Sequence, residues 1–409
     1  MINDRHNQQQ LTKYMKVLIV SLSNVGGGAS RAVANLYSSL KCKNIDVELL
    51  LFEGVKIDNK TSFVYNNKFS KLIFRIKNKF TKIIMGIFRN PSNDLRSINI
   101  FPSMLLHKIN ASNADIVNIH WIGSEMISIE QIPQINKPIV LTLHDAWLLN
   151  GMYHISPSHY YPLISENGTN LLDRWCICRK KKMASRKTLH IVSPSQWIKN
   201  DFLKSYFNNG KNTCDLIRNI IDDNVWKAYD KKSTKEELNF DLNKINVLFI
   251  ANNATKSLNK GFQFVTKLTE MCSNNFIFNI VGSNDIINLK NANSLGIIKD
   301  SNKLAKIYSA SDICLIPSMS ENLPNVALEA LMCNTPVLCF DTTGLKDIIK
   351  NNINGYRAKK FDIDDLFYGL NILASFKHNN CLINTIKEFN SEINTNKYIE
   401  LFDKYSRSH

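Results

Sequence analysis

The chain has 409 residues, which is more than one typical domain requires and enough for two of ordinary size. Its hydrophobic content of 44% and aromatic content of 10% exclude a disordered chain, and no apolar stretch approaches the roughly 20 residues of a membrane-spanning helix. The formal net charge of +16 predicts an acidic partner, such as nucleic acid, anionic lipid or a phosphorylated substrate.

The first residues of the chain and its cysteines predict the compartment in which the protein works. Residues 1–14 are polar and do not resemble a signal peptide, so we expect a flexible tail before the first strand. The nine cysteines are an odd number, and several lie in runs that are typical of buried strands or helices. These features predict a reduced, cytoplasmic protein. The spacing of Cys176 and Cys178 is not that of a usual zinc site.

The first half of the chain alternates between apolar runs and amphipathic segments. A strand over residues 16–22 and a helix over 30–40 flank the glycines Gly26, Gly27 and Gly28. These glycines either let the backbone approach a ligand closely at the first strand-to-helix turn or form a merely flexible turn. Further strands are expected at residues 47–52, 116–119, 139–143, 189–192 and 216–217. This alternation predicts a parallel sheet with helices on both faces.

Residues 68–90 form a basic and apolar segment. No acidic residue occurs between Asp58 and Asp94, and lysines and arginines alternate there with large apolar residues. Such a helix can bind an anionic membrane surface, with apolar side chains inserted and cations on the headgroups. The alternative is a helix packed on the sheet with its lysines in water. No recognition motif accompanies the charge, so we do not expect nucleic acid as the partner.

Polar residues follow two of the predicted strands of the first half. His120 follows residues 116–119, and His144 and Asp145 follow residues 139–143. Ligands gather at the carboxyl ends of strands in open α/β sheets, so these side chains are candidates for a binding site. A structural role for each histidine is the alternative.

A polar, charged stretch at residues 223–244 predicts a linker between a first domain, residues 15–222, and a second, residues 245–391. The second domain shows the same alternation, with strands expected at residues 247–251, 276–281, 313–316 and 337–340. The fold class is therefore α/β, with two Rossmann-like, doubly wound parallel-sheet domains.

Two carboxylates, Glu321 and Glu329, lie where a strand passes into a helix expected at about residues 324–332. Pro324 suits the first helical position, and Ser320 or Asn322 could cap the helix. The positive helix end favours a phosphate, and the two glutamates could hold hydroxyls on either side of it. A nucleotide sugar has that arrangement of groups. The alternative is that both glutamates are solvated residues on the helix surface.

The residues around this pair resemble a known family. Three features resemble the retaining glycosyltransferases of family 4, which have the GT-B fold. They are residues 316–318 (Ile-Pro-Ser), the seven residues between the two glutamates, and the ending 328–330 (Leu-Glu-Ala). Residues 118–121 and 143–147 resemble the sugar transferases of bacterial exopolysaccharide (colanic-acid-like) and O-antigen assembly. Residues 260–262 match the Lys-Gly element of the family. The usual arginine before it is missing, and Lys256 stands near its place.

The resemblance implies two domains facing a cleft, with a C-terminal helix at about residues 392–409 that packs back on the first. It implies transfer of a hexose-type sugar, with retention, from a UDP- or GDP-linked donor to a lipid-linked surface oligosaccharide (O-antigen, capsule or exopolysaccharide). No cofactor or metal would be required, and the protein would be peripheral on the inner face of the cytoplasmic membrane.

The resemblance also implies a role for each candidate residue. His144 and Glu321 would contact the sugar as catalytic residues, and Glu329 would hold the ribose. His120 and Asp145 would lie on the acceptor side. The remaining donor-binding residues would be Gly26, Gly27, Gly28, Lys256, Lys260, Asn322, Leu323, Asn325 and Val326. Two other functions fit the same architecture: a nucleotide-sugar epimerase, which needs no acceptor, and a catalytically silent scaffold.

Overall fold

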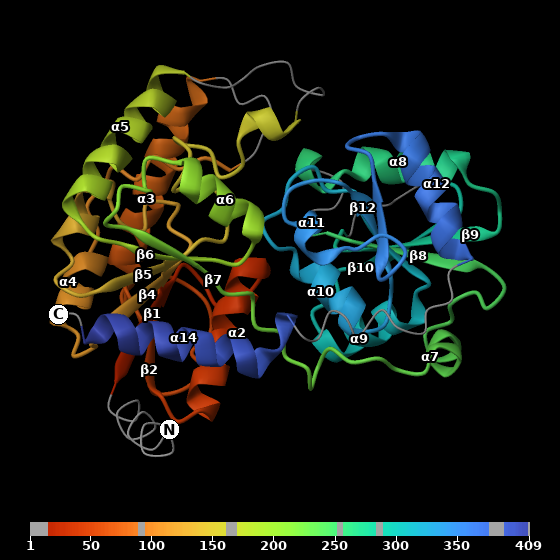
Figure 1. Cartoon of the computed structure of the whole chain (residues 1–409), viewed down its shortest axis with the longest axis horizontal. Helices are drawn as coiled ribbons and strands as arrows, with labels where there is room; N and C mark the ends of the chain where they lie inside the picture. Colours follow the sequence, from red (N-terminus) through yellow and green to blue (C-terminus); the bar gives the residue numbers. More distant parts are fainter. Residues whose placement is uncertain are drawn as a thin grey trace. The chain divides into compact units, whose positions relative to one another are not determined.

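The alternation of strands and helices forms two parallel sheets in the computed structural model, which describes residues 15–88, 95–160, 170–251, 257–283, 289–375 and 388–407 (Figure 1). The chain splits into two compact units. The first unit is Met1–Ile220 with Ser391–His409, and the second unit is Ile221–Asn390. Each has a parallel sheet covered by helices, so the predicted fold class is confirmed.

The first unit has a seven-stranded sheet in the order β3-β2-β1-β4-β5-β6-β7. Its strands are β1 (Lys16–Ser21), β2 (Asp46–Leu51), β3 (Thr61–Phe63), β4 (Ile116–His120), β5 (Ile139–Thr142), β6 (His190–Ser193) and β7 (Thr213–Leu216). Its helices are α2 (Gly28–Cys42), α3 (Lys68–Gly86), α4 (Leu105–Ala111), α5 (Leu171–Arg186), α6 (Gln196–Lys204) and α14 (Ser391–Ser406), with 3-10 turns η1 (Ile129–Gln134) and η2 (Pro157–Tyr160).

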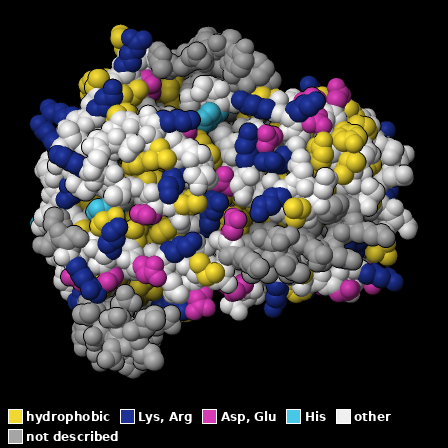
Figure 2. All heavy atoms as spheres, viewed as in Figure 1, with side chains coloured by type: hydrophobic (Ala, Val, Ile, Leu, Met, Phe, Trp, Pro, Cys, Tyr) yellow, Lys and Arg dark blue, Asp and Glu magenta, His cyan; other side chains and the backbone are white. Residues whose placement is uncertain are grey.

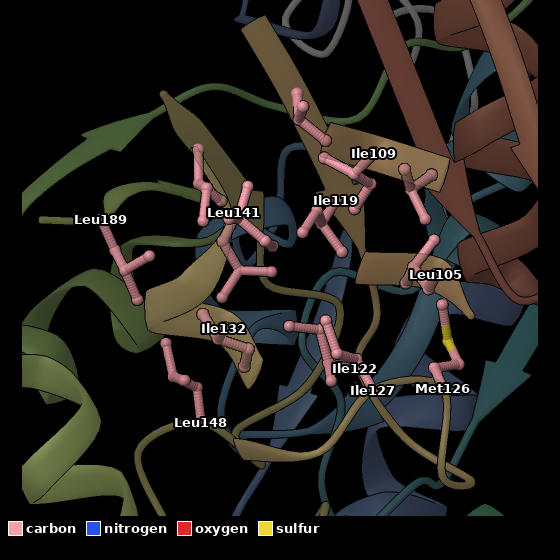
Figure 3. Packing of buried hydrophobic residues seen from close by; sticks show 14 of the residues in the cluster. Leu105, Ile109, Ile119, Ile122, Met126, Ile127, Ile132, Leu141, Leu148 and Leu189 are labelled. Carbon is pink, nitrogen blue, oxygen red and sulfur yellow. The ribbon is translucent and has the colours of Figure 1, made fainter. Parts of the chain in front are cut away.

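Side chains of β1 point alternately to the two faces of this sheet, as the period of a strand requires. Val17 and Ile19 join a core that includes Phe402 of α14. Leu18 and Val20 join the core on the other face, which includes side chains from β4, β5, α4 and η1. Figure 3 shows this second core, where Leu105, Ile109, Ile119, Ile132 and Leu141 pack together. Apolar cores on both faces explain why these strands are apolar runs without alternation.

The second unit has a six-stranded sheet in the order β10-β9-β8-β11-β12-β13. Its strands are β8 (Ile245–Ile250), β9 (Phe276–Val281), β10 (Ala292–Gly296), β11 (Ile313–Ile316), β12 (Val337–Phe340) and β13 (Gly355–Ala358). Its helices are α7 (Lys231–Glu237), α8 (Phe262–Met271), α9 (Ser301–Ala310), α10 (Asn325–Met332), α11 (Leu345–Ile348) and α12 (Ile363–Ala374), with the 3-10 turn η3 (Leu258–Lys260).

The strand order reverses between β1 and β4 in the first sheet and between β8 and β11 in the second. At such a reversal the loops leave neighbouring strands in opposite directions and open a crevice at the carboxyl ends. The candidate residues follow these four strands or the adjacent β5. The strands that sequence analysis missed, β3, β10 and β13, lie at or next to sheet edges, where short and partly exposed strands lack a continuous apolar run.

Residues 223–244, which we expected to form a linker, instead pack into the second unit. Trp226 is buried and its ring lies 5.8 Å from that of Tyr308, edge to face. Residues Lys231–Glu237 form α7, and Lys235 donates to Asp312 at 2.8 Å. The charges that suggested a solvated linker therefore pair with a carboxylate far away in the sequence. The predicted flexible tail, residues 1–14, lies outside the described residues.

Candidate functional site

In the second unit, Asn259 holds the loop after β8 against the loop after β11. Its side-chain NH₂ donates to Ser320 O at 2.8 Å, and its Oδ1 accepts from Ser320 N at 3.0 Å. The backbone N–H of Met319 also donates to Asn259 O at 2.8 Å. Because Asn259 is buried, these bonds are shielded from water and fix the relative position of the two loops.

Lys260 and Glu321 meet as a result. The Nζ of Lys260 lies 2.6 Å from Glu321 Oε1, and the two side chains are 34% and 14% exposed. The next residue, Gly261, has a φ of +72°, and a Cβ there would lie 2.0 Å from Pro317 O. Glycine is therefore required for the turn that brings Lys260 to the strand ends. A partly exposed ammonium and a largely covered carboxylate thus lie where the strand order reverses.

The loop after β12 completes this group. Thr343 Oγ1 accepts from Glu321 N at 2.8 Å, and Gly344 N donates to Glu321 O at 3.0 Å. A Cβ on Gly344 would lie 1.4 Å from Asn322 O. The backbone of Glu321 and Asn322 is therefore held on both sides.

The helix that carries the second glutamate, α10, begins at Asn325. Its N-cap is Pro324, so this proline lies one position before the first helical residue at which it was expected. Leu323 and Asn325 are buried, whereas Asn322 and Val326 are partly exposed. The first amides of α10 follow directly on the loop that carries Glu321, and a helix N-terminus of this kind favours an anion.

Glu329 lies inside the second unit. Its side chain is 2% exposed, and its Oε2 accepts from the hydroxyl of Tyr308 at 3.0 Å. With Glu321 also largely covered, the alternative that both glutamates are solvated surface residues is wrong. A buried carboxylate needs hydrogen-bond donors, which suits a group that holds hydroxyls.

In the first unit, His120 and His144 contact each other at the ends of β4 and β5. His120 Nδ1 lies 2.9 Å from His144 Nε2, and His120 Nε2 lies 2.6 Å from Asn118 Oδ1. Burial lowers the pKa of His144 to about 4 and that of His120 well below its usual value, so both rings are neutral at pH 7.

We therefore expect the stability of the protein to depend on pH through His144. Between pH 6.5 and about 4 the unfolded chain binds a proton that the folded ring does not. The free energy of unfolding should fall by on the order of 1–3 kcal/mol as the pH is lowered through this window and should be unaffected by His144 above it. Urea unfolding at a series of pH values measures this. His144→Gln should make this fall smaller, whereas His107→Gln, at an exposed position of α4, should not. The same pH dependence in the unaltered protein and both variants would contradict a contribution of His144.

Asp145 binds its own neighbours. It accepts from Trp121 Nε1 at 2.6 Å and from Trp147 N at 2.9 Å, and His154 Nδ1 lies 2.6 Å from the same carboxylate. Burial by itself raises the pKa of Asp145, but His154 and these hydrogen bonds outweigh it and hold the pKa below its usual value. Asp145 therefore acts as an anion that positions Trp121 and His154. A pocket beside it is lined by Trp121, Ile122, Leu141, Thr142, Leu143, His144, Asp145, Trp147 and Leu148.

Sequence reasoning missed Lys180 and His154. Lys180, on α5, is fully buried and donates to Trp147 O, Asn150 O and Gly151 O. Burial lowers its pKa to about 7, yet three carbonyl acceptors require the three donors of an ammonium. His154 Nε2 forms a hydrogen bond with Ser97 Oγ, 2.8 Å away. In the sequence Lys180 belongs to a basic run, residues 179–182, which reads as a solvated surface, and His154 is a single histidine outside a predicted strand end.

The glycine turn after β1 leaves space around its backbone. Gly26 has a φ of +109°, and no atom lies within 4 Å of a Cβ placed on Gly26 or Gly27. Gly28 begins α2, so the turn lies at the N-terminus of a 15-residue helix. The turn is held at its start by Asn24, whose side chain bonds the backbone of Val55 in both directions at 2.8 and 3.0 Å. A ligand could thus approach this backbone without obstruction.

Most of the basic segment is the helix α3. One face carries large apolar side chains that are exposed, and within the helix only Thr81 and Met85 are buried. This apolar face of α3 consists of Phe69, Leu72, Ile76, Phe80 and Ile83, with Ile87 just beyond the helix. The helix also packs on its unit, as the alternative expected, because Phe74 contacts one core cluster and Met85 is buried in another. Lys and Arg side chains recur over the visible face of the molecule (Figure 2).

Three further expectations concern Lys256, a metal ion and the membrane. Lys256 lies outside the described residues. In the described part of the chain, no cluster of three His, Cys, Asp or Glu side chains could hold a metal ion. Within the same residues, no helix has the length and apolarity to cross a membrane.

Part of the chain is similar to known glycosyltransferases. The family model "Glycosyl transferases group 1" matches residues 230–384. An uncharacterized glycosyltransferase of Methanocaldococcus jannaschii is 29% identical over 98 residues, 24% of this chain and 22% of that protein. One of Haemophilus influenzae is 30% identical over 67 residues, 16% of this chain and 19% of that protein. The match thus spans about a fifth of the length of these relatives.

Solved structures show the fold of the whole chain. Sucrose-phosphate synthase from Thermosynechococcus elongatus has a TM-score of 0.71 at 16% identity, covering 97% of this chain and 100% of that one. HepE of Anabaena, in complex with UDP and glucose, has a TM-score of 0.69 at 15% identity, covering 96% and 100%. The chain has the GT-B fold of these proteins, with two parallel-sheet α/β domains.

Proposed function

We propose that the protein is a retaining, family-4-type glycosyltransferase that moves a hexose-type sugar from a UDP- or GDP-linked donor to a hydroxyl of a lipid-linked bacterial surface oligosaccharide, as in O-antigen, capsule or exopolysaccharide assembly. The observation that carries this proposal is the Lys260–Glu321 pair, 2.6 Å apart at the reversal of strand order in the domain that matches group 1 glycosyl transferases. The complex of HepE with UDP-glucose, a protein of the same fold, supports a nucleotide-sugar donor.

The donor has an anionic centre between two groups of hydroxyls. Lys260 and the first amides of α10 would bind its diphosphate, with Asn322, Leu323, Asn325 and Val326 lining that loop and helix start. Glu321 would accept hydrogen bonds from sugar hydroxyls, and Glu329 would hold the ribose. The open backbone of Gly26, Gly27 and Gly28 adds donors for the phosphate, and we assign Lys256 the same role as a point charge.

In the proposed reaction the bond between the anomeric carbon and the diphosphate oxygen breaks, and a bond to the acceptor oxygen forms on the same face. The acceptor proton passes to the departing diphosphate oxygen, so no protein nucleophile is needed. Negative charge develops on the leaving group, and Lys260 with the α10 amides stabilises it because they are already in place. We propose that these groups replace a metal ion and that no cofactor takes part. His144 would contact the sugar, and His120 would support it on the acceptor side.

The anomeric configuration of the product tests this function. We expect purified protein, incubated with a panel of UDP- and GDP-sugars and lipid-linked acceptors, to release nucleoside diphosphate and form a product whose ¹H coupling at the anomeric carbon matches that of the donor. Inverted configuration would contradict the mechanism. Conversion of the donor to its epimer without an acceptor would contradict the reaction class.

The exposed apolar face of α3 supports a location at a membrane. We propose that its apolar face inserts into the interface of an anionic membrane, so that the protein is peripheral on the inner face of the cytoplasmic membrane. The exposed residues of this face are spaced three or four apart, which places them on one side of the helix. The segment between Asp58 and Asp94 has no acidic residue, so its charge is complementary to anionic headgroups.

Vesicle sedimentation tests the membrane proposal. The double variant Ile76→Ser, Ile83→Ser should lower the fraction bound to phosphatidylglycerol vesicles roughly tenfold to a hundredfold, because two large apolar side chains lose their burial. Leu203→Ser removes a comparably exposed apolar side chain from α6 and should bind as the unaltered protein does. Binding should also weaken as salt is raised. Equal sedimentation of both variants would contradict a role for this face.

A further inference from the structure

A chain of buried hydrogen bonds runs from α14 to His144 and has a defined direction. The hydroxyl of Tyr398 lies 3.3 Å from Thr142 Oγ1, and Asn118 Nδ2 lies 3.1 Å from both Thr142 Oγ1 and Val140 O. A backbone carbonyl can only accept a hydrogen bond. The atom of Asn118 that faces Val140 O must therefore be the NH₂ group, which leaves Oδ1 to face His120.

The orientation of Asn118 determines where the proton of His120 lies. Asn118 Oδ1 can only accept, and it lies 2.6 Å from His120 Nε2, so Nε2 carries the hydrogen. Burial keeps the His120 ring neutral, and its Nδ1 is then an acceptor. Nδ1 lies 2.9 Å from Nε2 of His144, which must be the donor in this contact.

This hydrogen bond also determines which nitrogen of the His144 ring carries the proton. Its Nε2 is protonated whether the ring is neutral or charged, because His120 Nδ1 accepts from it. In the neutral ring the other nitrogen, Nδ1, then has a free lone pair, and His144 lines the pocket beside Asp145. Asp145, the charged group next in the chain, already binds Trp121, His154 and the backbone of Trp147, so it does not reverse this arrangement.

We propose that Asn118 is a positioning residue which, through His120, makes Nδ1 of His144 a committed hydrogen-bond acceptor. The group it recognises on the substrate must then be a hydrogen-bond donor, which on a hexose is a hydroxyl, and an oxygen without a hydrogen is rejected at this point. The identification of that hydroxyl as one of the transferred sugar rests on the proposed function. The direction of the hydrogen bonds does not.

Side-chain ¹⁵N NMR of protein labelled at histidine tests the direction of the chain without any substrate. We expect His120 and His144, assigned by His→Gln variants, both to show a protonated Nε2 and an unprotonated Nδ1. A protonated Nδ1 in neutral His144 of the unaltered protein would overturn the proposal, even if the variants below failed to fold.

Three variants separate the proposal from a general structural role. Asn118→Leu removes the acceptor and should give mixed tautomers at both rings. Asn118→Asp keeps an acceptor towards His120 and, protonated, a donor towards Val140, so the native tautomers should return. Thr142→Val disturbs the same buried chain of hydrogen bonds but leaves the bond between Asn118 and Val140. This variant should therefore also show the native tautomers of both histidines. Unchanged tautomers in Asn118→Leu would refute the proposal.

Transfer rates provide a second, separate readout. In Asn118→Leu, kcat/KM should fall about tenfold to a hundredfold, the size expected when a substrate group loses its buried partner, and Asn118→Asp should recover most of it. If no transfer occurs with the unaltered protein, the proposed function fails while the tautomer result still decides the role of Asn118. If transfer is normal in Asn118→Leu although its tautomers are mixed, His144 Nδ1 does not bind the substrate hydroxyl.

Discussion

Replacing Lys260 by methionine is expected to lower the rate of sugar transfer by about 10²- to 10³-fold, because charge on the departing diphosphate then loses a preorganised cation. Methionine keeps much of the side-chain length, and Lys260 is a third exposed, so the fold should survive. The loss should appear mainly in kcat if the ammonium acts most strongly in the transition state. Steady-state release of nucleoside diphosphate measures it.

The matched control is Lys306→Met. Lys306 also pairs with a glutamate of the second unit, since its Nζ lies 2.7 Å from Glu237 Oε1, and its side chain is 33% exposed. It lies on α9 and Glu237 on α7, so neither follows a strand end. Transfer by Lys306→Met should equal that of the unaltered protein. Full activity in Lys260→Met, or an equal loss in both variants, would remove Lys260 from the site.

Gly344→Ala should abolish most donor binding although it adds a single carbon. The new Cβ would lie 1.4 Å from Asn322 O, so the loop that carries Glu321 must move. We expect overpacking to lower the free energy of unfolding by about 1–3 kcal/mol. A displacement of about 1 Å at Glu321 should lower kcat/KM on the order of 10²-fold. Urea unfolding measures the stability, donor titration the affinity, and steady-state transfer kcat/KM.

Gly86→Ala is the control for this variant. Gly86 is the last residue of α3, and no atom lies within 4 Å of a Cβ placed there. Alanine should stabilise the helix slightly and leave donor affinity unchanged. Unaltered donor affinity in Gly344→Ala would show that the loop after β12 does not hold Glu321 in place for the ligand.

The pair of Lys260 and Glu321 illustrates what the sequence could predict. Each follows an apolar run of the length of a buried strand, and the carboxyl ends of parallel strands meet at one edge of a sheet. This rule places Lys260 and Glu321 in the same region of the sheet before any contact between them is known. Gly261 follows Lys260 for a reason that only the structure shows, the close approach of Pro317 O. The clamp by Asn259 was not predicted because an asparagine in a loop has many possible partners.

The same limit explains the residues that were missed in the first unit. Lys180 binds backbone carbonyls of residues 147–151, and His154 binds Ser97 and Asp145. Backbone carbonyls leave no trace in a sequence, and partners dozens of residues away follow no period. The linker was misread for a related reason, since Lys235 reads as solvated until Asp312 is seen beside it. Periodicity reports burial along an element, whereas these residues depend on contacts between elements.

Calorimetric titration with UDP, GDP and their sugars tests the central claim most directly, because it measures donor binding by the second unit apart from any acceptor. At least one nucleotide sugar should bind the unaltered protein and Lys306→Met with equal affinity and bind Lys260→Met and Glu329→Gln at least about tenfold more weakly, while circular dichroism shows all four folded. Absence of binding by every nucleotide sugar, or equal affinity across the four proteins, would contradict the assignment of this site as the donor site.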